Sequence, residues 1–187
     1  MTDRMPPLSP ERMTNEQRQA AAELSAGPRG GVRGPFIALL RSPRLMSRLQ
    51  KVGEYLRYES ALEPRLAEFA MLIVARHLTQ QFEWQTHYPL ALKAGLAKEV
   101  AEALAQGARP RGMKPDEEAL YDFCGELLQR HGVSDATYQR ALEPLGERGV
   151  VDLVGLVGYF ITVSLVMNVA RTPEGETVTV PLEPFPA

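Results

Sequence analysis

The chain has 187 residues, of which 44% are hydrophobic and 24% are charged. These proportions are typical of one globular domain and argue against a disordered chain. The formal net charge of −2 and the even spread of lysine and arginine give no indication of a nucleic-acid-binding protein, and the single cysteine, Cys124, excludes an internal disulfide or dithiol.

Residues 1–34 are expected to form one helix between two irregular segments. The chain starts with a polar, proline-rich stretch that lacks the apolar core of a signal peptide, which favours a cytoplasmic protein. Thr14 and Gln17 have the spacing of a capping box, so a helix is predicted from there to about Ser25. Residues 27–35 contain four glycines and two prolines, which predicts an irregular loop.

Residues 35–171 are expected to form the helical core, because apolar residues recur there at helical spacing. Helices are predicted at residues 36–40, 42–58, 63–78, 82–94, 98–106, 115–130 and 134–145. Ser42 is expected to cap the second of these, with proline at its first position. The helix over 63–78 is apolar on most sides, so it should be central. Gly95 and Gly132 are expected to end the helices that precede them.

The stretch from Val150 to Ala170 is the most apolar in the chain. Its length would suit a transmembrane helix. Polar residues within it, such as Asp152 and Asn168, and two glycines that permit close packing favour instead a buried bundle helix or a subunit interface.

The tail, residues 172–187, contains four prolines and is predicted to be irregular. Val178 and Val180 alternate in it as in an edge strand or an arm on a neighbouring subunit. Strand signals are lacking elsewhere. The sequence therefore predicts a single all-α domain over residues 1–187, folded as a compact multi-helix bundle.

Ionisable residues stand in an apolar setting only between Glu68 and Leu96. Glu83 and His87 are four residues apart and share a helical face. Glu68 lies on the preceding helix among apolar residues, where burial disfavours a charged carboxylate unless a cation such as protonated His87 compensates. Such a group could share a proton near neutral pH, which is the requirement of general acid–base catalysis.

Other interpretations of the same residues stay open. A Glu–His pair at this spacing is common on solvated helix faces, and Glu68 could pair with Arg65 or Arg76 instead. Trp84 is of a type more often found in a core than beneath a substrate. Two carboxylates and one histidine could also bind a metal, but a single histidine is a weak signal, and no metal is expected.

The pattern around these residues resembles that of the carboxymuconolactone decarboxylase and alkylhydroperoxidase superfamily, over roughly residues 36–170. The peroxidase branch has Glu, eleven residues, and then Cys-x-x-Cys-x-x-x-His. The present sequence has Glu68, eleven residues, and then Gln80-x-x-Glu83-x-x-x-His87. Both cysteines are replaced, so the resemblance favours the decarboxylase branch, and peroxidase activity is left as the disfavoured alternative.

The resemblance implies a helical bundle that assembles as a homo-oligomer, a trimer or a hexamer, around a small-molecule site. It implies a cofactor-free lyase that acts on a small carboxylated lactone or keto acid in aromatic-compound catabolism, because the substrate's own carbonyl can accept the electron pair. His87 is then expected to donate the proton, Glu83 to orient its imidazole, and Glu68 to act as a second acid or base.

Substrate binding is predicted for Arg29, Arg33, Trp84 and Gln80. The two arginines lie in the glycine-rich loop, where they could fold over a pocket and bind a carboxylate; other candidates are Arg41, Arg76 and Arg171. An ordinary solvated loop remains the alternative for these arginines, and a non-catalytic oligomer that binds a small ligand remains the alternative for the whole protein.

Overall fold

The computed structural model of the protein describes residues 2–173 and 180–182, and this part of the chain is helical, without strands. A 3-10 turn, η1, spans Pro10–Arg12 and is followed by α1 (Asn15–Ala26), α2 (Pro35–Leu39), α3 (Pro43–Tyr58), α4 (Pro64–His77), α5 (Gln81–Lys93), α6 (Lys98–Ala105), α7 (Pro115–Arg130) and α8 (Asp135–Ala170). The all-α prediction is confirmed.

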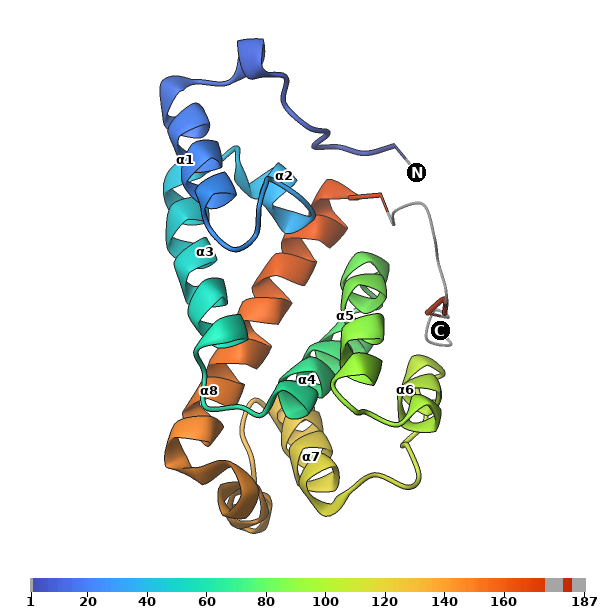
Figure 1. The fold of residues 1–187 in the computed structure, drawn as a ribbon. Coiled ribbons are helices and arrows are strands. Elements are labelled where there is room, and N and C mark those ends of the chain that lie inside the picture. The colour runs from blue at the N-terminus through green and yellow to red at the C-terminus, as the bar shows by residue number, and fades with distance from the viewer. Residues whose placement is uncertain (1, 174–179, 183–187) are drawn as a thin grey trace.

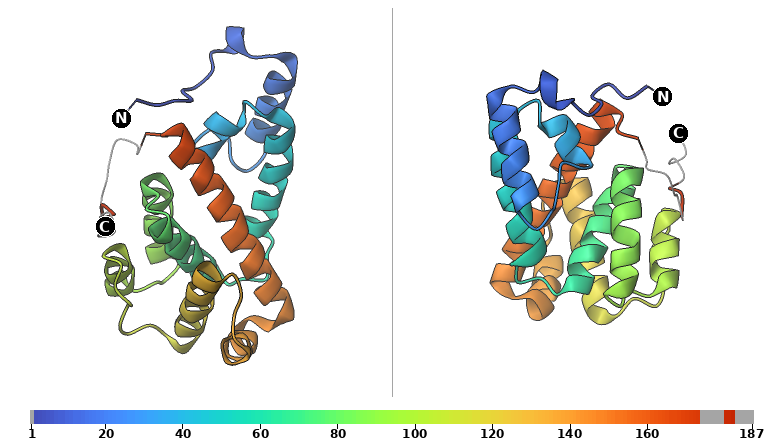
Figure 2. Two further views of the ribbon diagram at one scale, coloured as in Figure 1. Left: turned by 180° about the vertical axis from the view of Figure 1, so that it is seen from behind. Right: turned by 45° about the horizontal axis from the view of Figure 1, so that its top comes forward.

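Helix α8 crosses the molecule between two groups of helices. Helices α1, α2 and α3 lie on one side of it, and α4 to α7 lie on the other (Figures 1 and 2). Eleven of the fourteen residues of α4 are buried, as expected for a central helix. The main hydrophobic core is built on α4 and α8, and a smaller one joins α1, α2 and α3.

Most predicted helix starts agree with the structure, but two capping details differ. Thr14 and Gln17 form the expected capping box at the start of α1. Ser42 precedes α3 without a side-chain hydrogen bond, so the proline at the first position of the helix marks its start instead. The residue that ends α7 in the left-handed conformation is His131, with φ of 63°, and not Gly132.

The last two predicted helices are joined in α8. Gly146 interrupts it with φ of 66° and ψ of 172°, so the predicted break exists, but it is one residue wide. The proposed strand residue Val178 lies outside the described residues. Val180 and Leu182 of the tail contact Gln81 at the start of α5 through hydrogen bonds.

Helix α8 is long and apolar enough to cross a membrane by length and composition alone, with a mean hydropathy of 2.2 over its most apolar window. More than half of that window, 56%, is buried inside the protein. Core helices of globular proteins can have the same length and apolar composition, so the packing agrees with the predicted bundle helix. Four large apolar side chains of the helix remain exposed: Val151, Val154, Leu165 and Val169.

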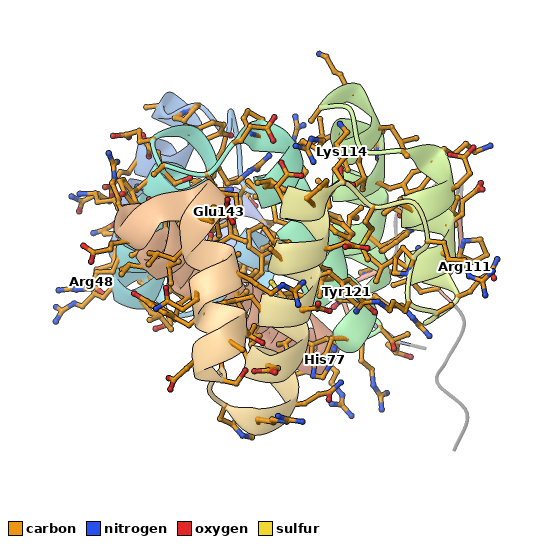
Figure 3. All side chains as sticks on the ribbon, turned by 90° about the horizontal axis from the view of Figure 1, so that it is seen from below. Arg48, His77, Arg111, Lys114, Tyr121 and Glu143 are labelled. Carbon is orange, nitrogen blue, oxygen red and sulfur yellow. The ribbon has the colours of Figure 1, made fainter. Side chains whose placement is uncertain are left out.

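Charged side chains lie on more than one side of the molecule. In the view from below, Arg48 and Arg111 lie at opposite edges, and Lys114 and Glu143 lie between them (Figure 3). This distribution agrees with the even spread of charge along the sequence.

Candidate active site

His87 lies between two carboxylates that come from neighbouring helices. Its Nδ1 atom is 2.7 Å from Oε2 of Glu68 on α4, and its Nε2 atom is 3.3 Å from Oε2 of Glu83 on α5. The expected convergence of these three side chains is therefore present. Each ring nitrogen has its own carboxylate partner, so the imidazole is fixed in orientation from both sides.

The turn between α4 and α5 places these groups opposite each other. Thr79 takes the left-handed conformation, with φ of 47°, and lets α5 fold back along α4. Gln80 then caps α5, because its side-chain oxygen accepts hydrogen bonds from the backbone N–H groups of Phe82 and Glu83 at 2.7 and 3.3 Å. Its amide nitrogen donates to Asn168 of α8 at 2.9 Å.

The three groups are largely removed from water. His87 is 2% exposed and Glu83 is 4% exposed, whereas the side chain of Glu68 is 15% exposed. Burial alone would lower the pKa of His87, but hydrogen bonds and attraction to Glu68 and Glu83 outweigh it, so the pKa lies above its ordinary value. The imidazole is therefore biased toward its charged form.

A cavity of about 380 Å³ opens beside this group. Glu83 and His87 line it, whereas Glu68 lies across the imidazole and is not among the described lining residues. Much of the rest of the wall is aromatic or cationic, with the residues Phe36, Phe82, Tyr159, Phe160, Arg29, Arg33 and Arg57. A volume of this size suits a small organic molecule.

The structure separates the residues that were predicted to bind substrate. Arg29 and Arg33 line the cavity, as expected of the glycine-rich loop. Trp84 does not: it is fully buried and packs against Tyr88, because adjacent helical residues point about 100° apart and Glu83 already faces the cavity. Gln80 lines a different cavity and caps α5, so neither Trp84 nor Gln80 is among the described lining residues of the cavity beside His87.

The lining residues that the sequence interpretation missed include Arg57 at the end of α3, and Tyr159 and Phe160 on α8. Phe160 contacts His87 edge-to-face, with ring centroids 5.1 Å apart. The only sequence signal was Gly53, a glycine inside a helix, which commonly marks a close approach of another group. The other arginine candidates, Arg41, Arg76 and Arg171, are not among the described lining residues.

Cys124 is buried on α7, and burial raises the pKa of its thiol to about 12, so it is not a thiolate at neutral pH. Among the described residues, no group of three or more histidine, cysteine, aspartate or glutamate side chains is arranged to hold a metal ion.

Two comparisons place these observations among known proteins. Residues 43–121 match the carboxymuconolactone decarboxylase family. The fold is similar to a crystal structure described as an alkylhydroperoxidase AhpD core, an uncharacterised peroxidase-related protein from Ralstonia eutropha JMP134, with a TM-score of 0.71 and 16% sequence identity over 89% of this chain and 88% of that chain. No curated protein matches the chain.

The family match includes Glu68, Glu83 and His87 but ends well before α8. The cavity wall formed by Arg29, Arg33, Tyr159 and Phe160 lies outside it.

Proposed function

We propose that this protein is a cofactor-free acid–base enzyme, on the basis of its similarity to the carboxymuconolactone decarboxylase family and to the alkylhydroperoxidase-like fold. Its substrate is a small carboxylated lactone or keto acid, from which it removes carbon dioxide. The observation that carries this proposal is the buried His87, held between Glu68 and Glu83 at the wall of a cavity.

The three groups form a route for a proton. Glu68 is the most exposed of them and lies on the side of His87 away from the cavity, so it exchanges protons with solvent and holds Nδ1 of the imidazole. Glu83 and Nε2 of His87 face the substrate. The roles expected from the sequence are therefore rearranged: Glu68 orients the imidazole, and Glu83 acts with His87 as the substrate-facing acid.

In the reaction, the bond between the substrate's ring or chain carbon and its carboxylate breaks, and carbon dioxide leaves. The electron pair moves into the conjugated carbonyl and forms an enolate. Protonated His87, directly or through Glu83, then transfers a proton to the carbon, and the enolate returns to a carbonyl. Solvent restores the proton through Glu68. A positioned acid of this kind contributes roughly 10²- to 10⁴-fold to the rate.

The cavity wall also suits an anionic substrate. Arg29, Arg33 and Arg57 all line the cavity, whereas Glu83 is its only acidic lining residue among those described. Guanidinium groups bind carboxylates through paired hydrogen bonds. The surrounding aromatic rings of Phe36, Phe82 and Phe160 favour a flat, unsaturated molecule.

The test is release of carbon dioxide from a panel of small carboxylated lactones and β-keto acids. The wild-type protein is expected to turn over at least one of them, and Glu83→Gln is expected to reduce kcat by roughly 10²-fold or more because it removes the proton donor beside His87. Glu99→Gln is the matched control, since Glu99 is exposed on α6.

Two results would contradict the proposal. One is equal turnover by Glu83→Gln and the wild-type protein. The other is consumption of an organic hydroperoxide with a dithiol reductant and no release of carbon dioxide, which would favour the peroxidase alternative. The replacement of both motif cysteines by Gln80 and Glu83, and the raised pKa of Cys124, support the acid–base reaction over that alternative.

A further inference from the structure

Gly53 occupies an unfavourable position that the packing of the cavity explains. It lies inside α3 and is buried, although glycine destabilises a helix interior relative to alanine. A Cβ atom at this position would lie 2.2 Å from the hydroxyl oxygen of Tyr159 and 2.6 Å from Nη2 of Arg29. The backbone of α3 thus makes room for a phenol and a guanidinium side by side.

The ring of Tyr159 is held by packing, but its hydroxyl group does not use all of its hydrogen-bonding capacity among the described residues. It is 6% exposed, and its ring contacts Phe160 edge-to-face with centroids 5.5 Å apart, while Phe160 in turn contacts His87. Its hydroxyl oxygen accepts a long hydrogen bond from Nη2 of Arg29 at 3.4 Å. Within the described part of the chain, the hydroxyl proton has no acceptor, which is uncommon for a buried tyrosine.

Arg29, which contacts the hydroxyl of Tyr159, also has a hydrogen-bond donor without a partner among the described residues. Its Nε atom is buried without a hydrogen-bond partner among the described residues, and its guanidinium lies over the ring of Phe36, 4.7 Å from the centroid. Two residues that line the cavity and contact each other, Tyr159 and Arg29, thus each carry a hydrogen-bond donor without a partner among the described residues: the phenol proton and this N–H group. A ligand oxygen that carries negative charge would satisfy both.

The protonation state of the Tyr159 hydroxyl is the one required of a hydrogen-bond donor. Burial raises the pKa of Tyr159 above its ordinary value, and the positive charges of Arg29 and Arg57 offset this only in part. The hydroxyl therefore keeps its proton at neutral pH and can donate it in a hydrogen bond.

We propose that Tyr159 and Arg29, packed over Gly53, form the oxyanion subsite of this cavity and bind the enolate-type oxygen of a flat, conjugated substrate. The inference rests on the proposed function, in which Glu83 and His87 supply the proton while this subsite stabilises the charge that develops on the carbonyl oxygen. The proton of Tyr159 stays on its own oxygen throughout, so no bond to it breaks.

The test uses 4-nitrophenol, a flat acid whose ionised form absorbs visible light and resembles an enolate. Absorbance is followed as a function of pH for the probe bound to wild-type protein and to Tyr159→Phe. The wild-type protein is expected to bind the ionised probe about tenfold or more tightly than the neutral one, so that the probe's pKa falls on binding. Tyr159→Phe is expected to remove that fall while keeping the aromatic packing.

The matched control is Tyr121→Phe, which removes a hydroxyl from a half-buried tyrosine on α7 that lines a different cavity (Figure 3). It is expected to leave the probe's pKa at the wild-type value. Gly53→Ala is expected to give the same result as Tyr159→Phe, because the added methyl group displaces both donors.

The proposal is overturned if the wild-type protein does not bind 4-nitrophenol, or if Tyr159→Phe leaves the bound probe's pKa unchanged. It is also overturned if Tyr159→Phe weakens the binding of benzoate but not that of ionised 4-nitrophenol. The subsite would then recognise carboxylates and not enolates. The probe undergoes no proton transfer to carbon, so these outcomes are separate from the carbon dioxide assay. If the wild-type protein shifts the probe's pKa but releases no carbon dioxide from any substrate of the panel, only the proposed function is contradicted.

Discussion

At the scale of single residues, His87 is subject to opposing effects. Burial disfavours its charged form, while Glu68 and Glu83 favour it, and the pKa is raised as the net result. A group whose pKa is higher in the folded than in the unfolded protein stabilises the fold when protonated. That contribution is fully present below the unfolded pKa and is lost as the pH rises through the folded pKa.

The raised pKa of His87 is predicted to make the stability of the folded protein depend on pH. We compare the free energy of unfolding of the wild-type protein with that of His87→Gln. The difference is expected to be largest at pH values just below 6.5, the ordinary pKa of histidine. It is expected to fall at higher pH, with a slope of up to about 1.4 kcal/mol per pH unit. Urea denaturation at a series of pH values measures it. His131→Gln is the control, since His131 is exposed, and a pH-independent difference for His87→Gln would contradict the prediction.

Apart from Arg29 and Arg33 of the glycine-rich loop, the site residues that the sequence predicted correctly are close to one another in the chain. Glu83 and His87 share a helical face by spacing, and Glu68 lies on the adjacent helix. Trp84 is on the same helix as Glu83 and His87 but is buried away from their cavity, because hydrophobicity does not indicate which face of the helix the core occupies. Tyr159 could not be predicted, since its contact with Gly53 depends on how α3 and α8 pack across a separation of more than a hundred residues.

At the scale of elements, an ion pair inside the core joins α4 to α7. Arg65 on α4 is 8% exposed and binds both Glu117, which is 1% exposed, and Asp116. The same Glu117 side chain accepts a hydrogen bond from the backbone N–H of Lys114 at 2.7 Å. The carboxylate therefore fixes both the start of α7 and its position against the central helix.

Removal of this carboxylate is predicted to destabilise the fold strongly. Glu117→Ala should lower the free energy of unfolding by about 3 kcal/mol, because the guanidinium of Arg65 stays buried with only part of its pairing. Glu118→Ala, an exposed change in the same first turn, is the control and should cost well under half as much. Chemical denaturation measures both, and equal losses would show that the buried pair contributes nothing beyond helix propensity.

Helix starts were more predictable than helix ends. Proline, capping residues and acidic first turns mark where α1, α4 and α7 begin, because the signal is local. The end of α7 at His131 and the near-continuity of α8 through Gly146 depend on the packing of the flanking turns, which short sequence patterns do not contain.

At the scale of the whole molecule, the Glu68–His87–Glu83 group joins the central helix α4 to a cavity lined by residues of α3, α5 and α8. We expect the predicted homo-oligomer to form over the exposed valines and leucine of α8. The oligomer and the cytoplasmic location stay predictions from the sequence.

The most direct measurement of the proposed proton route is a ¹⁵N NMR titration of the His87 imidazole in the wild-type protein, Glu68→Gln and Glu83→Gln. His87 is predicted to titrate above its ordinary pKa of 6.5 in the wild-type protein, and at a lower pH in each variant, because each carboxylate stabilises the charged ring. A His87 that titrates at or below 6.5 in the wild-type protein, and is unmoved by either substitution, would contradict the acid–base account of this site.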